Sequence, residues 1–279
     1  MVRLAGIQMT AGPALEDNLR AAEAFLHEAA RDNAQVAVLP ENFALYAGDY
    51  RRCAEQHGER LRQWLSDQAR SLGLFLVGGT IPLLAREDGS HVPAPRVRSV
   101  SLVHGPDGRQ LARYDKLHLF DAQVQDAHGR YRESAVFEAG NATRVVDIAG
   151  ICTGLAVCYD LRFASQARAL ADEGASLLVY PSAFTETTGH AHWQLLLRAR
   201  AVETGCYVFG VNQCGQHTET RRSYGHSMLV DPWGEIVAAR ESSPGVLVAD
   251  LAPERIDEVR RRMPVHQHQK FTVQLNDDN

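Results

Sequence analysis

The sequence has few cysteines and no long hydrophobic run. Its five cysteines are odd in number and none belongs to a CxxC pair, so neither a disulfide framework nor a zinc ribbon is indicated, and we expect reduced thiols. No run approaches the roughly 18 apolar residues of a membrane span, and the first ten residues lack the basic region and cleavage site of a signal peptide. We therefore expect a cytoplasmic protein without a membrane partner.

An excess of positive charge is also absent. The 29 basic and 34 acidic side chains give a formal net charge of -5, so there is no electrostatic reason to expect nucleic acid as a partner. The hydrophobic share of 45% and the charged share of 23% are typical of a globular protein. No Ser/Gly linker, charge block or shift in composition divides the 279 residues, and we expect one domain.

Apolar runs typical of buried strands alternate with helical patterns, which predicts a layered α/β domain. The segments 97–103 and 111–114 flank the turn Gly105-Pro106-Asp107-Gly108, which predicts a β-hairpin. Residues 85–95 are predicted to form an exposed loop. The other predicted strands are 4–9, 36–39, 74–77, 145–148, 151–157, 177–180, 207–211, 227–230, 236–239 and 246–249, and the predicted helices are 15–31, 59–71, 163–173 and 190–204.

Three side chains of reactive types each follow an apolar run of this kind. They are Glu41, Lys116 and Cys158. In layered α/β folds, reactive groups from distant parts of the sequence meet at the ends of strands. The three side chains can therefore converge on one site.

Together these residues suit the hydrolysis of an amide. An amide carbon is a poor electrophile, so its attack needs a thiolate, a base, a donor for the developing oxyanion and an acid for the leaving amine. Cys158 would supply the sulfur, and Glu41 would take and return the proton. The Lys116 ammonium would stabilise the oxyanion and help to lower the thiol pKa. The backbone N–H of Tyr159 would be a second oxyanion donor if a helical turn begins there.

Each of the three residues also has an ordinary structural explanation. A cysteine after an apolar strand is commonly a small buried hydrophobic residue. A glutamate or a lysine in a loop is commonly solvated. Their positions relative to the predicted strands leave both interpretations open.

The segments around these residues resemble three motifs of the nitrilase, or carbon-nitrogen hydrolase, superfamily. Each motif holds one member of that family's Glu-Lys-Cys triad, in the same order along the chain. The resemblance runs from the first predicted strand to Arg262. The matching segments are Leu39-Pro40-Glu41-Asn42-Phe43, Tyr114-Asp115-Lys116-Leu117-His118-Leu119-Phe120-Asp121 and Gly154-Leu155-Ala156-Val157-Cys158-Tyr159-Asp160-Leu161-Arg162-Phe163.

The resemblance implies a four-layer α-β-β-α sandwich over residues 1–265. The remaining tail, 266–279, would be an interface arm of a homodimer or a larger assembly, and no cofactor or metal is required. A fourth catalytic residue is also implied, because Arg132-Glu133-Ser134 followed by Ala139-Gly140 matches the family's second glutamate, with Ala139 in place of the usual Pro. Glu133 would hydrogen-bond the lysine or orient the attacking water; the alternative is a surface carboxylate.

Within the superfamily the sequence is most similar to the Nit-type amidases, in particular the branch that hydrolyses deaminated glutathione. This implies a hydrolase of small linear carboxamides that forms a cysteine thioester, releases ammonia and acts on a substrate bearing a carboxylate. The segments that carry this likeness are 180–184, 192–201, 212–215, 223–228 and 261–265.

Other functions are the alternatives to this interpretation. From the same superfamily they are an ω-amidase acting on α-ketoglutaramate-type substrates and an N-carbamoyl hydrolase. From other classes they are a non-catalytic interaction protein and a thiol redox sensor.

One departure from the family lies directly after the cysteine motif. Ala164-Ser165-Gln166 stands where Pro-Glu-Leu is usual. Because Pro favours the first turn of a helix, its absence is expected to loosen the start of the following helix without preventing the fold.

Arg162 is the predicted contact for a substrate carboxylate, because a planar guanidinium can bind both oxygens. A structural ion pair with Asp160 or another acid is the alternative. Further side chains beside the motifs are predicted to contact the substrate, although aromatic residues at strand ends more often belong to the core. These are Phe43, Tyr46, Phe120, Tyr159, Phe184 and Thr185.

The remaining features favour no competing site. His190 and His192 are two residues apart, so on a helix they point to different sides, and no metal site is predicted. Gly78-Gly79 lacks the GxGxxG context of a dinucleotide site. Cys152 is the one rival thiol, but no family motif surrounds it.

Overall fold

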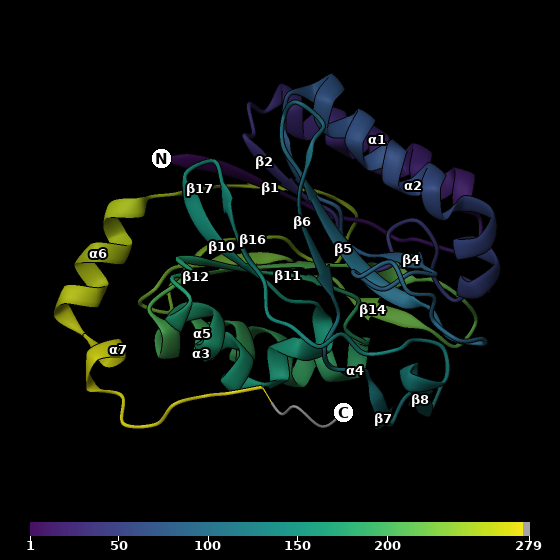
Figure 1. The fold of residues 1–279 in the computed structure, drawn as a ribbon. Coiled ribbons are helices and arrows are strands. Elements are labelled where there is room, and N and C mark those ends of the chain that lie inside the picture. The colour runs from purple at the N-terminus through teal and green to yellow at the C-terminus, as the bar shows by residue number, and fades with distance from the viewer. Residues whose placement is uncertain (276–279) are drawn as a thin grey trace.

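The computed structural model describes residues 1–275, which form a four-layer α-β-β-α sandwich (Figure 1). Two β-sheets pack face to face, and helices cover the outer face of each sheet. The arrangement confirms the predicted fold class. Within residues 1–275 no helix has the length and apolar character needed to cross a membrane.

The first sheet has seven strands in the order β17-β1-β2-β3-β5-β4, with β6 beside β5. Its strands β1, β2 and β3 are parallel, because the helices α1 (Leu15–Arg31) and α2 (Tyr50–Leu72) connect them as crossovers. The strands are β1 (Val2–Gln8), β2 (Val36–Val38), β3 (Phe75–Val77), β4 (Ile81–Leu83), β5 (Arg98–His104), β6 (Gln110–Asp115) and β17 (Gly245–Leu251).

The second sheet has six strands in the order β16-β15-β12-β11-β10-β9. Its parallel strands β10, β11 and β12 are connected by α3 (Ala164–Asp172) and α5 (Gln194–Thr204), which cover its outer face. The strands are β9 (Val145–Ile148), β10 (Ile151–Leu155), β11 (Leu177–Ser182), β12 (Tyr207–Asn212), β15 (Met228–Val230) and β16 (Ile236–Ala239).

Shorter elements surround these layers. The ribbons are β7 (Asp121–Gln123) with β8 (Arg130–Arg132) and β13 (Cys214–Gln216) with β14 (Arg222–Tyr224). The short turns are the 3-10 helices η1 (Glu133–Ala135) and η2 (Cys158–Arg162) and the π-helix η3 (Gly189–Trp193). The remaining helices are α4 (Glu186–Thr188), α6 (Pro253–Arg262) and α7 (Val265–His268).

Three apolar clusters fill the spaces between the four layers and hold the layers together. The middle cluster joins the two sheets through side chains such as Leu4 and Phe209, and each fully buried residue of this kind contributes about 1.5–3 kcal/mol. The sheets lie close together at Gly6, where a Cβ atom would lie 2.9 Å from both Phe209 and Val211. Gly6 therefore permits this packing.

The predicted elements are largely those of the structure. The β5–β6 hairpin, the β9–β10 pair and the exposed loop at 85–95 are confirmed. The helix predicted over 59–71 begins earlier, at Tyr50, because the Asp49 side chain caps it by accepting a hydrogen bond from Arg52 N at 2.9 Å. The two short ribbons were not predicted, because neither has the length or alternation that distinguishes a strand in a sequence.

The predicted tail, 266–279, lies only partly within the described residues, since 276–279 are outside them. Its first residues belong to α7, and the chain then runs along the side of the molecule that carries α3 and α5 (Figure 1). Gln269 Nε2 donates to Asp172 Oδ2 of α3 at 3.4 Å.

Candidate active site

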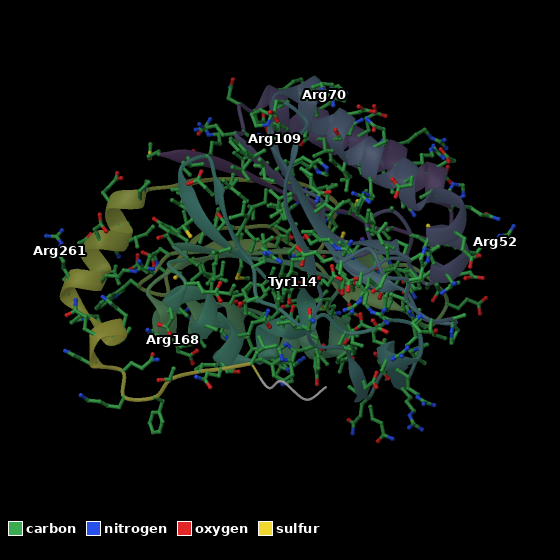
Figure 2. The ribbon with its side chains drawn as sticks, viewed as in Figure 1. Arg52, Arg70, Arg109, Tyr114, Arg168 and Arg261 are labelled. Carbon is green, nitrogen blue, oxygen red and sulfur yellow. The ribbon has the colours of Figure 1, made fainter. Side chains whose placement is uncertain are left out.

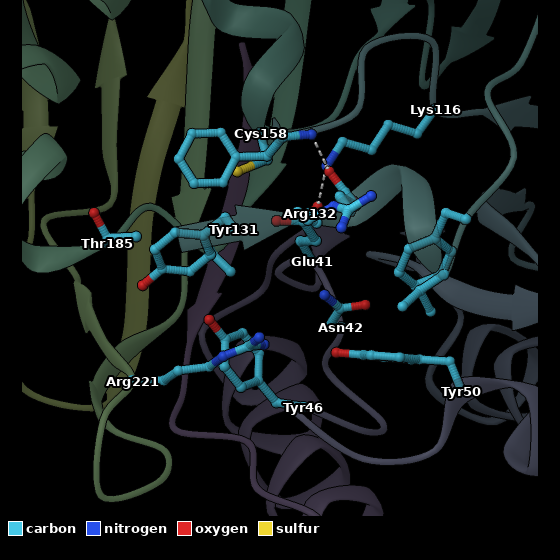
Figure 3. A pocket seen from close by; sticks show the side chains of 15 residues that line it. Glu41, Asn42, Tyr46, Tyr50, Lys116, Tyr131, Arg132, Cys158, Thr185 and Arg221 are labelled. Carbon is cyan, nitrogen blue, oxygen red and sulfur yellow. Dashed lines mark hydrogen bonds and ion pairs between the residues drawn. The ribbon is translucent and has the colours of Figure 1, made fainter. Parts of the chain in front are cut away.

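Glu41, Lys116 and Cys158 line one pocket (Figure 3). The first two follow β2 and β6 of one sheet, and Cys158 follows β10 of the other. Lys116 Nζ donates to Glu41 Oε1 at 2.7 Å, and these two residues are only 2% and 4% exposed. Both sheets therefore contribute residues to the site, which lies where the sheets face each other.

Glu133 completes the charged cluster from the start of η1. Both of its carboxylate oxygens lie 2.8 Å from Lys116 Nζ, and Oε2 also accepts from Phe120 N at 2.5 Å. Lys116 thus lies between two carboxylates, and Glu133 lies in the pocket instead of on the surface.

The charges of this cluster depend on one another. Burial opposes the charge of Lys116, but the adjacent Glu133 and Glu41 outweigh it and raise the pKa of the ammonium well above its ordinary value. Burial raises the pKa of Glu133, while Lys116 opposes that rise. Lys116 is therefore a fixed positive charge in the pocket.

The thiol of Cys158 does not have the depressed pKa that its neighbour Lys116 led us to expect. Burial and the negative charge of Glu41 raise the pKa of Cys158 well above its ordinary value, and Lys116 and a backbone hydrogen bond from Ala183 offset this only in part. The resting sulfur is protonated at neutral pH. A base must remove the proton as attack occurs.

The backbone at Cys158 has a φ of 47°, in the left-handed region that residues with a Cβ rarely adopt. Asp160, 1% exposed, holds this turn. Its Oδ2 accepts from Val157 N at 2.8 Å and from Tyr114 Oη at 2.7 Å, and its Oδ1 accepts from His118 N at 3.0 Å. One carboxylate thus joins the cysteine turn to the segment that carries the lysine.

Tyr114 lies at the centre of the molecule (Figure 2) and is 1% exposed. Its hydroxyl accepts from Gln166 Nε2 at 2.8 Å. Gln166 belongs to the segment that departs from the family's Pro-Glu-Leu, and α3 still begins there, at Ala164. The fold tolerates the departure, as expected, and Gln166 adds a contact between α3 and the Asp160 network.

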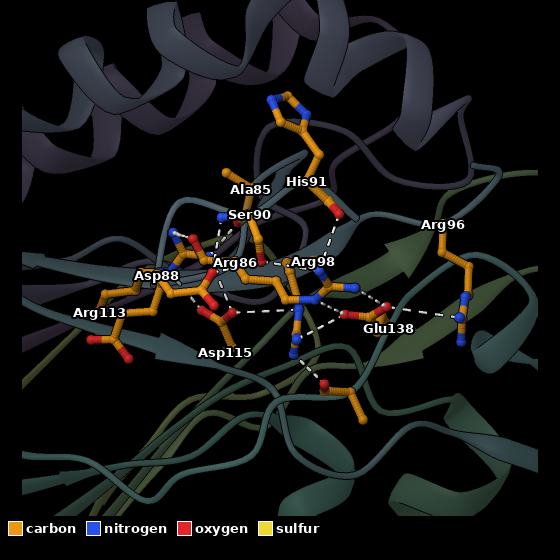
Figure 4. A network of polar contacts seen from close by, with 12 residues as sticks. Ala85, Arg86, Asp88, Ser90, His91, Arg96, Arg98, Arg113, Asp115 and Glu138 are labelled. Atoms are coloured by element: carbon orange, nitrogen blue, oxygen red, sulfur yellow. Dashed lines mark hydrogen bonds and ion pairs between the residues drawn. The ribbon is translucent and has the colours of Figure 1, made fainter. Parts of the chain in front are cut away.

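The chain beside Lys116 is fixed by a network of arginines and carboxylates (Figure 4). Arg98 Nη2 lies 2.8 Å from Glu138 Oε1, and Arg98 Nε lies 3.6 Å from Asp115 Oδ2. Gly140 N donates to Lys116 O at 2.8 Å, and a Cβ at Gly140 would lie 2.2 Å from Asp115 O. Only glycine fits at this close approach to the strand that positions the lysine.

The pocket has a volume of about 120 Å³. The predicted contacts Tyr46, Phe120 and Thr185 line it. A second, smaller pocket adjoins Cys158 and is lined by the predicted contacts Tyr159, Arg162 and Phe184, and again by Phe120 and Thr185.

Phe43, also predicted to contact the substrate, does not line either pocket. It is fully buried in the cluster beneath α1 and α2, where its ring lies 5.6 Å from that of Trp64. Asn42, with a φ of 56°, turns the chain after Glu41 and itself lines the pocket. The structure does not bring Phe43 to the pocket, because this turn directs the next side chain into the core.

Comparison with known proteins identifies the family. The carbon-nitrogen hydrolase family model matches residues 3–261. The chain belongs to this family. The deaminated glutathione amidase of Yersinia enterocolitica is 37% identical over 272 residues, covering 96% of this chain and 93% of that protein. The omega-amidase NIT2 of Danio rerio is also 37% identical, over 265 residues covering 94% of this chain and 92% of that protein.

A solved structure agrees with this assignment. Saccharomyces cerevisiae Nit3, a member of branch 10 of the nitrilase superfamily, matches with a TM-score of 0.84 at 30% identity, and the match covers 97% of each chain. The predicted family is confirmed, and the protein is a carbon-nitrogen hydrolase, an enzyme that acts on amides.

Arg162 of this carbon-nitrogen hydrolase has no carboxylate partner among residues 1–275. Asp160, its alternative partner, is occupied by the contacts described above. The Arg162 guanidinium lies 5.2 Å from the ring centroid of Phe184, and its Nη1 lies 3.2 Å from His192 Nδ1. It remains available to an anionic ligand.

Several pocket residues were missed from the sequence. Tyr131 and Arg132 precede Glu133 directly, so their position beside a predicted site residue could have suggested them. Tyr50 and Arg221 had no such signal, because they come from the first turn of α2 and from the turn between β13 and β14. The lining residues absent from the prediction include Asn42, Tyr50, Tyr131, Arg132, Val136, Phe137, Ala183 and Arg221.

The competing features lie away from this chemistry. His190 and His192 belong to η3, and the described part of the chain has no group of three or more His, Cys, Asp or Glu side chains placed to hold a metal ion. Cys152 lies on β10 and lines neither of the two pockets at Cys158.

Proposed function

We propose that this enzyme hydrolyses deaminated glutathione through a thioester on Cys158. The observation that carries the proposal is the buried cluster of Glu41, Lys116 and Glu133 in the pocket that contains the cysteine. The similarity to a deaminated glutathione amidase over nearly the whole chain supports the substrate.

The first half of the reaction forms the thioester. Glu41, which lines the same pocket as Cys158, takes the thiol proton as the sulfur attacks the amide carbon. The carbonyl oxygen gains negative charge, which the Lys116 ammonium and the Tyr159 N–H, in the first turn of η2, stabilise. The carbon–nitrogen bond then breaks, and Glu41 gives the proton to the leaving amine.

The second half releases the acid. Glu41 takes a proton from water, and the resulting hydroxide attacks the thioester carbon. The new tetrahedral oxyanion collapses, the carbon–sulfur bond breaks, and Glu41 returns the proton to the sulfur. Glu133 accepts hydrogen bonds from Lys116, as Glu41 does, and so helps to fix the ammonium where the oxyanion forms in both steps. The sum is an amide and water giving an acid and an amine.

The acyl part of the substrate is proposed to lie in the smaller pocket, where Arg162 meets its carboxylate. Burial lowers the pKa of Arg162 from its ordinary value, and an anionic ligand would compensate this cost. Tyr159 and Phe184 flank the guanidinium and limit the width of the pocket.

The alternative is an ω-amidase, because the omega-amidase of Danio rerio is equally similar in sequence. The two functions differ in their leaving groups. The scissile amide of deaminated glutathione is a peptide-type secondary amide, so its leaving group is a peptide amine in place of the ammonia expected from the sequence. A terminal amide such as α-ketoglutaramate releases ammonia. Steady-state kinetics on both substrates separates the functions, and a higher kcat/KM for the terminal amide would reverse the assignment.

Cys158→Ala tests the nucleophile. We expect a loss of at least about 10³-fold in kcat, because no other thiol lines the pocket. Mass spectrometry of wild-type protein quenched during turnover should show an acyl adduct on the peptide that contains Cys158. Cys152→Ala is the matched control and should retain activity. Unchanged hydrolysis by Cys158→Ala would exclude the mechanism.

The location, the oligomeric state and the domain bounds of the enzyme are further parts of the proposal. We propose a cytoplasmic homodimer or larger homo-oligomer in which residues 1–265 form the catalytic domain and 266–279 an interface arm. Exposed apolar side chains on and near α5 and α6, namely Leu195, Val202 and Met263, support an interface. Sedimentation of the full chain and of a chain ending at Val265 tests the arm.

A further inference from the structure

The main pocket extends beyond the groups that perform the chemistry. From Cys158 and Lys116 it passes Glu41 and ends beside Tyr46 and Arg221 (Figure 3). Amide hydrolysis as derived above uses neither of the last two residues. This part of the pocket therefore needs a separate explanation.

Within the described residues, Arg221 is a cation without an acidic partner. Among residues 1–275 it forms no ion pair, whereas the adjacent Arg222 pairs with Glu186 at 3.0 Å on the surface. One Arg221 nitrogen, Nη2, lies 3.0 Å from His128 Nε2, and the guanidinium lies 5.7 Å from the ring centroid of Tyr131. These contacts fix the side chain at the pocket and leave its other N–H groups for a ligand.

The position of Glu41 decides which part of the substrate reaches Arg221. Glu41 gives the proton to the leaving nitrogen, so the leaving group must lie on the Glu41 side of Cys158. The acyl part then takes the other side, toward Arg162 in the smaller pocket. The pocket beyond Glu41, which ends at Arg221, is the place for the leaving amine and its substituent.

We propose that Arg221 binds a carboxylate on the leaving group and so selects substrates with an anionic group on each side of the scissile amide. The inference rests on the proposed function and extends it: Arg162 receives the acyl carboxylate, and Arg221 receives the carboxylate of the departing amine. Tyr46, whose ring stacks on His217 at 4.0 Å, walls the route between Glu41 and Arg221.

This assignment distinguishes the two candidate substrates. Deaminated glutathione leaves a peptide amine that ends in a carboxylate, which would pair with Arg221. A terminal amide leaves ammonia, which reaches no farther than Glu41 and leaves the Arg221 end of the pocket to water. Arg221 thus favours secondary amides with an acidic leaving group over terminal amides.

The test compares Arg221→Gln with wild-type enzyme on two substrates, deaminated glutathione and its analogue with the terminal carboxylate converted to an amide. A lost charge-assisted hydrogen bond should lower kcat/KM for the acid by about 10- to 100-fold, mainly through KM. The analogue lacks the carboxylate, so its kcat/KM should fall far less. The ratio of the two kcat/KM values should therefore approach one in the variant.

Arg222→Gln is the matched control, because it removes the neighbouring guanidinium outside the pocket, and it should keep the wild-type ratio. An equal loss on both substrates, or no loss, would overturn the inference and give Arg221 at most a structural role. Failure of the proposed function would look different, because wild-type enzyme would then not cleave deaminated glutathione at all.

Discussion

At the scale of single residues, burial strongly affects the pKa values of the side chains in this site. Cys158 lies next to a lysine, and proximity alone suggests a thiolate. Burial and the carboxylate of Glu41 instead keep the sulfur protonated. The proposed mechanism therefore assigns this carboxylate the role of base, which distinguishes the site from those in which a resting thiolate pairs with a cation.

The reactivity of Cys158 toward N-ethylmaleimide should report this protonated state. Because the thiolate is the reacting form, the rate of modification should rise about tenfold per pH unit from pH 6 to 9 without a plateau. Glu41→Gln removes a charge that raises the thiol pKa, so the variant should react faster at pH 8. Mass spectrometry of the Cys158 peptide measures both rates.

A plateau in the modification rate below pH 7 would show a resting thiolate and contradict this view of the site. The peptide that contains Cys152 provides an internal control within each sample.

At the scale of elements, the site depends on how the turn after β10 is tied to the end of β6. Asp160 makes this connection by accepting from Val157 N on one side and from Tyr114 and His118 on the other. The left-handed backbone of Cys158 persists because these hydrogen bonds fix the residues around it.

Asp160→Asn should impair both stability and catalysis. The amide keeps the shape of the carboxylate but has one accepting oxygen in place of two, so contacts at one end of the side chain lose their acceptor. We expect the free energy of unfolding to fall by about 1–3 kcal/mol and kcat to fall by at least about tenfold. Urea unfolding and steady-state kinetics measure the two effects.

Asp172→Asn is the control for this substitution. Asp172 pairs with Arg168 on the surface of α3, with a side chain 42% exposed, and such pairs contribute at most about 1 kcal/mol. If Asp160→Asn retained wild-type kcat, Asp160 would have no role in positioning the nucleophile.

The whole molecule should lose stability in mild acid because two histidines are buried in neutral form. Burial, and secondarily the charge of Arg62, lowers the pKa of His104 to about 4. Burial also lowers the pKa of His217 to about 4, despite the opposing hydrogen bond with Ala11. Between pH 6.5 and 4 the unfolded chain binds protons at these sites that the folded chain does not, so stability falls as the pH falls.

At pH 5 each of these histidines should cost about 2 kcal/mol of unfolding free energy relative to pH 7. Urea unfolding at the two pH values measures the change. His104→Gln should remove about half of the histidine-dependent loss, whereas the exposed His27→Gln should leave it unchanged. A pH dependence that is the same in both variants would contradict the neutral buried state of His104.

The sequence by itself determined the fold class, most strands and helices, and the four charged or nucleophilic residues of the site, because each lies in a local motif or apolar run. Only the tertiary structure decided which side chains share the pocket. Phe43 turns into the core although it adjoins Glu41, and Arg221 reaches the pocket from a turn far along the chain. The physical reason is that motif and periodicity are local, whereas this pocket arises where two sheets and the loops at their ends meet.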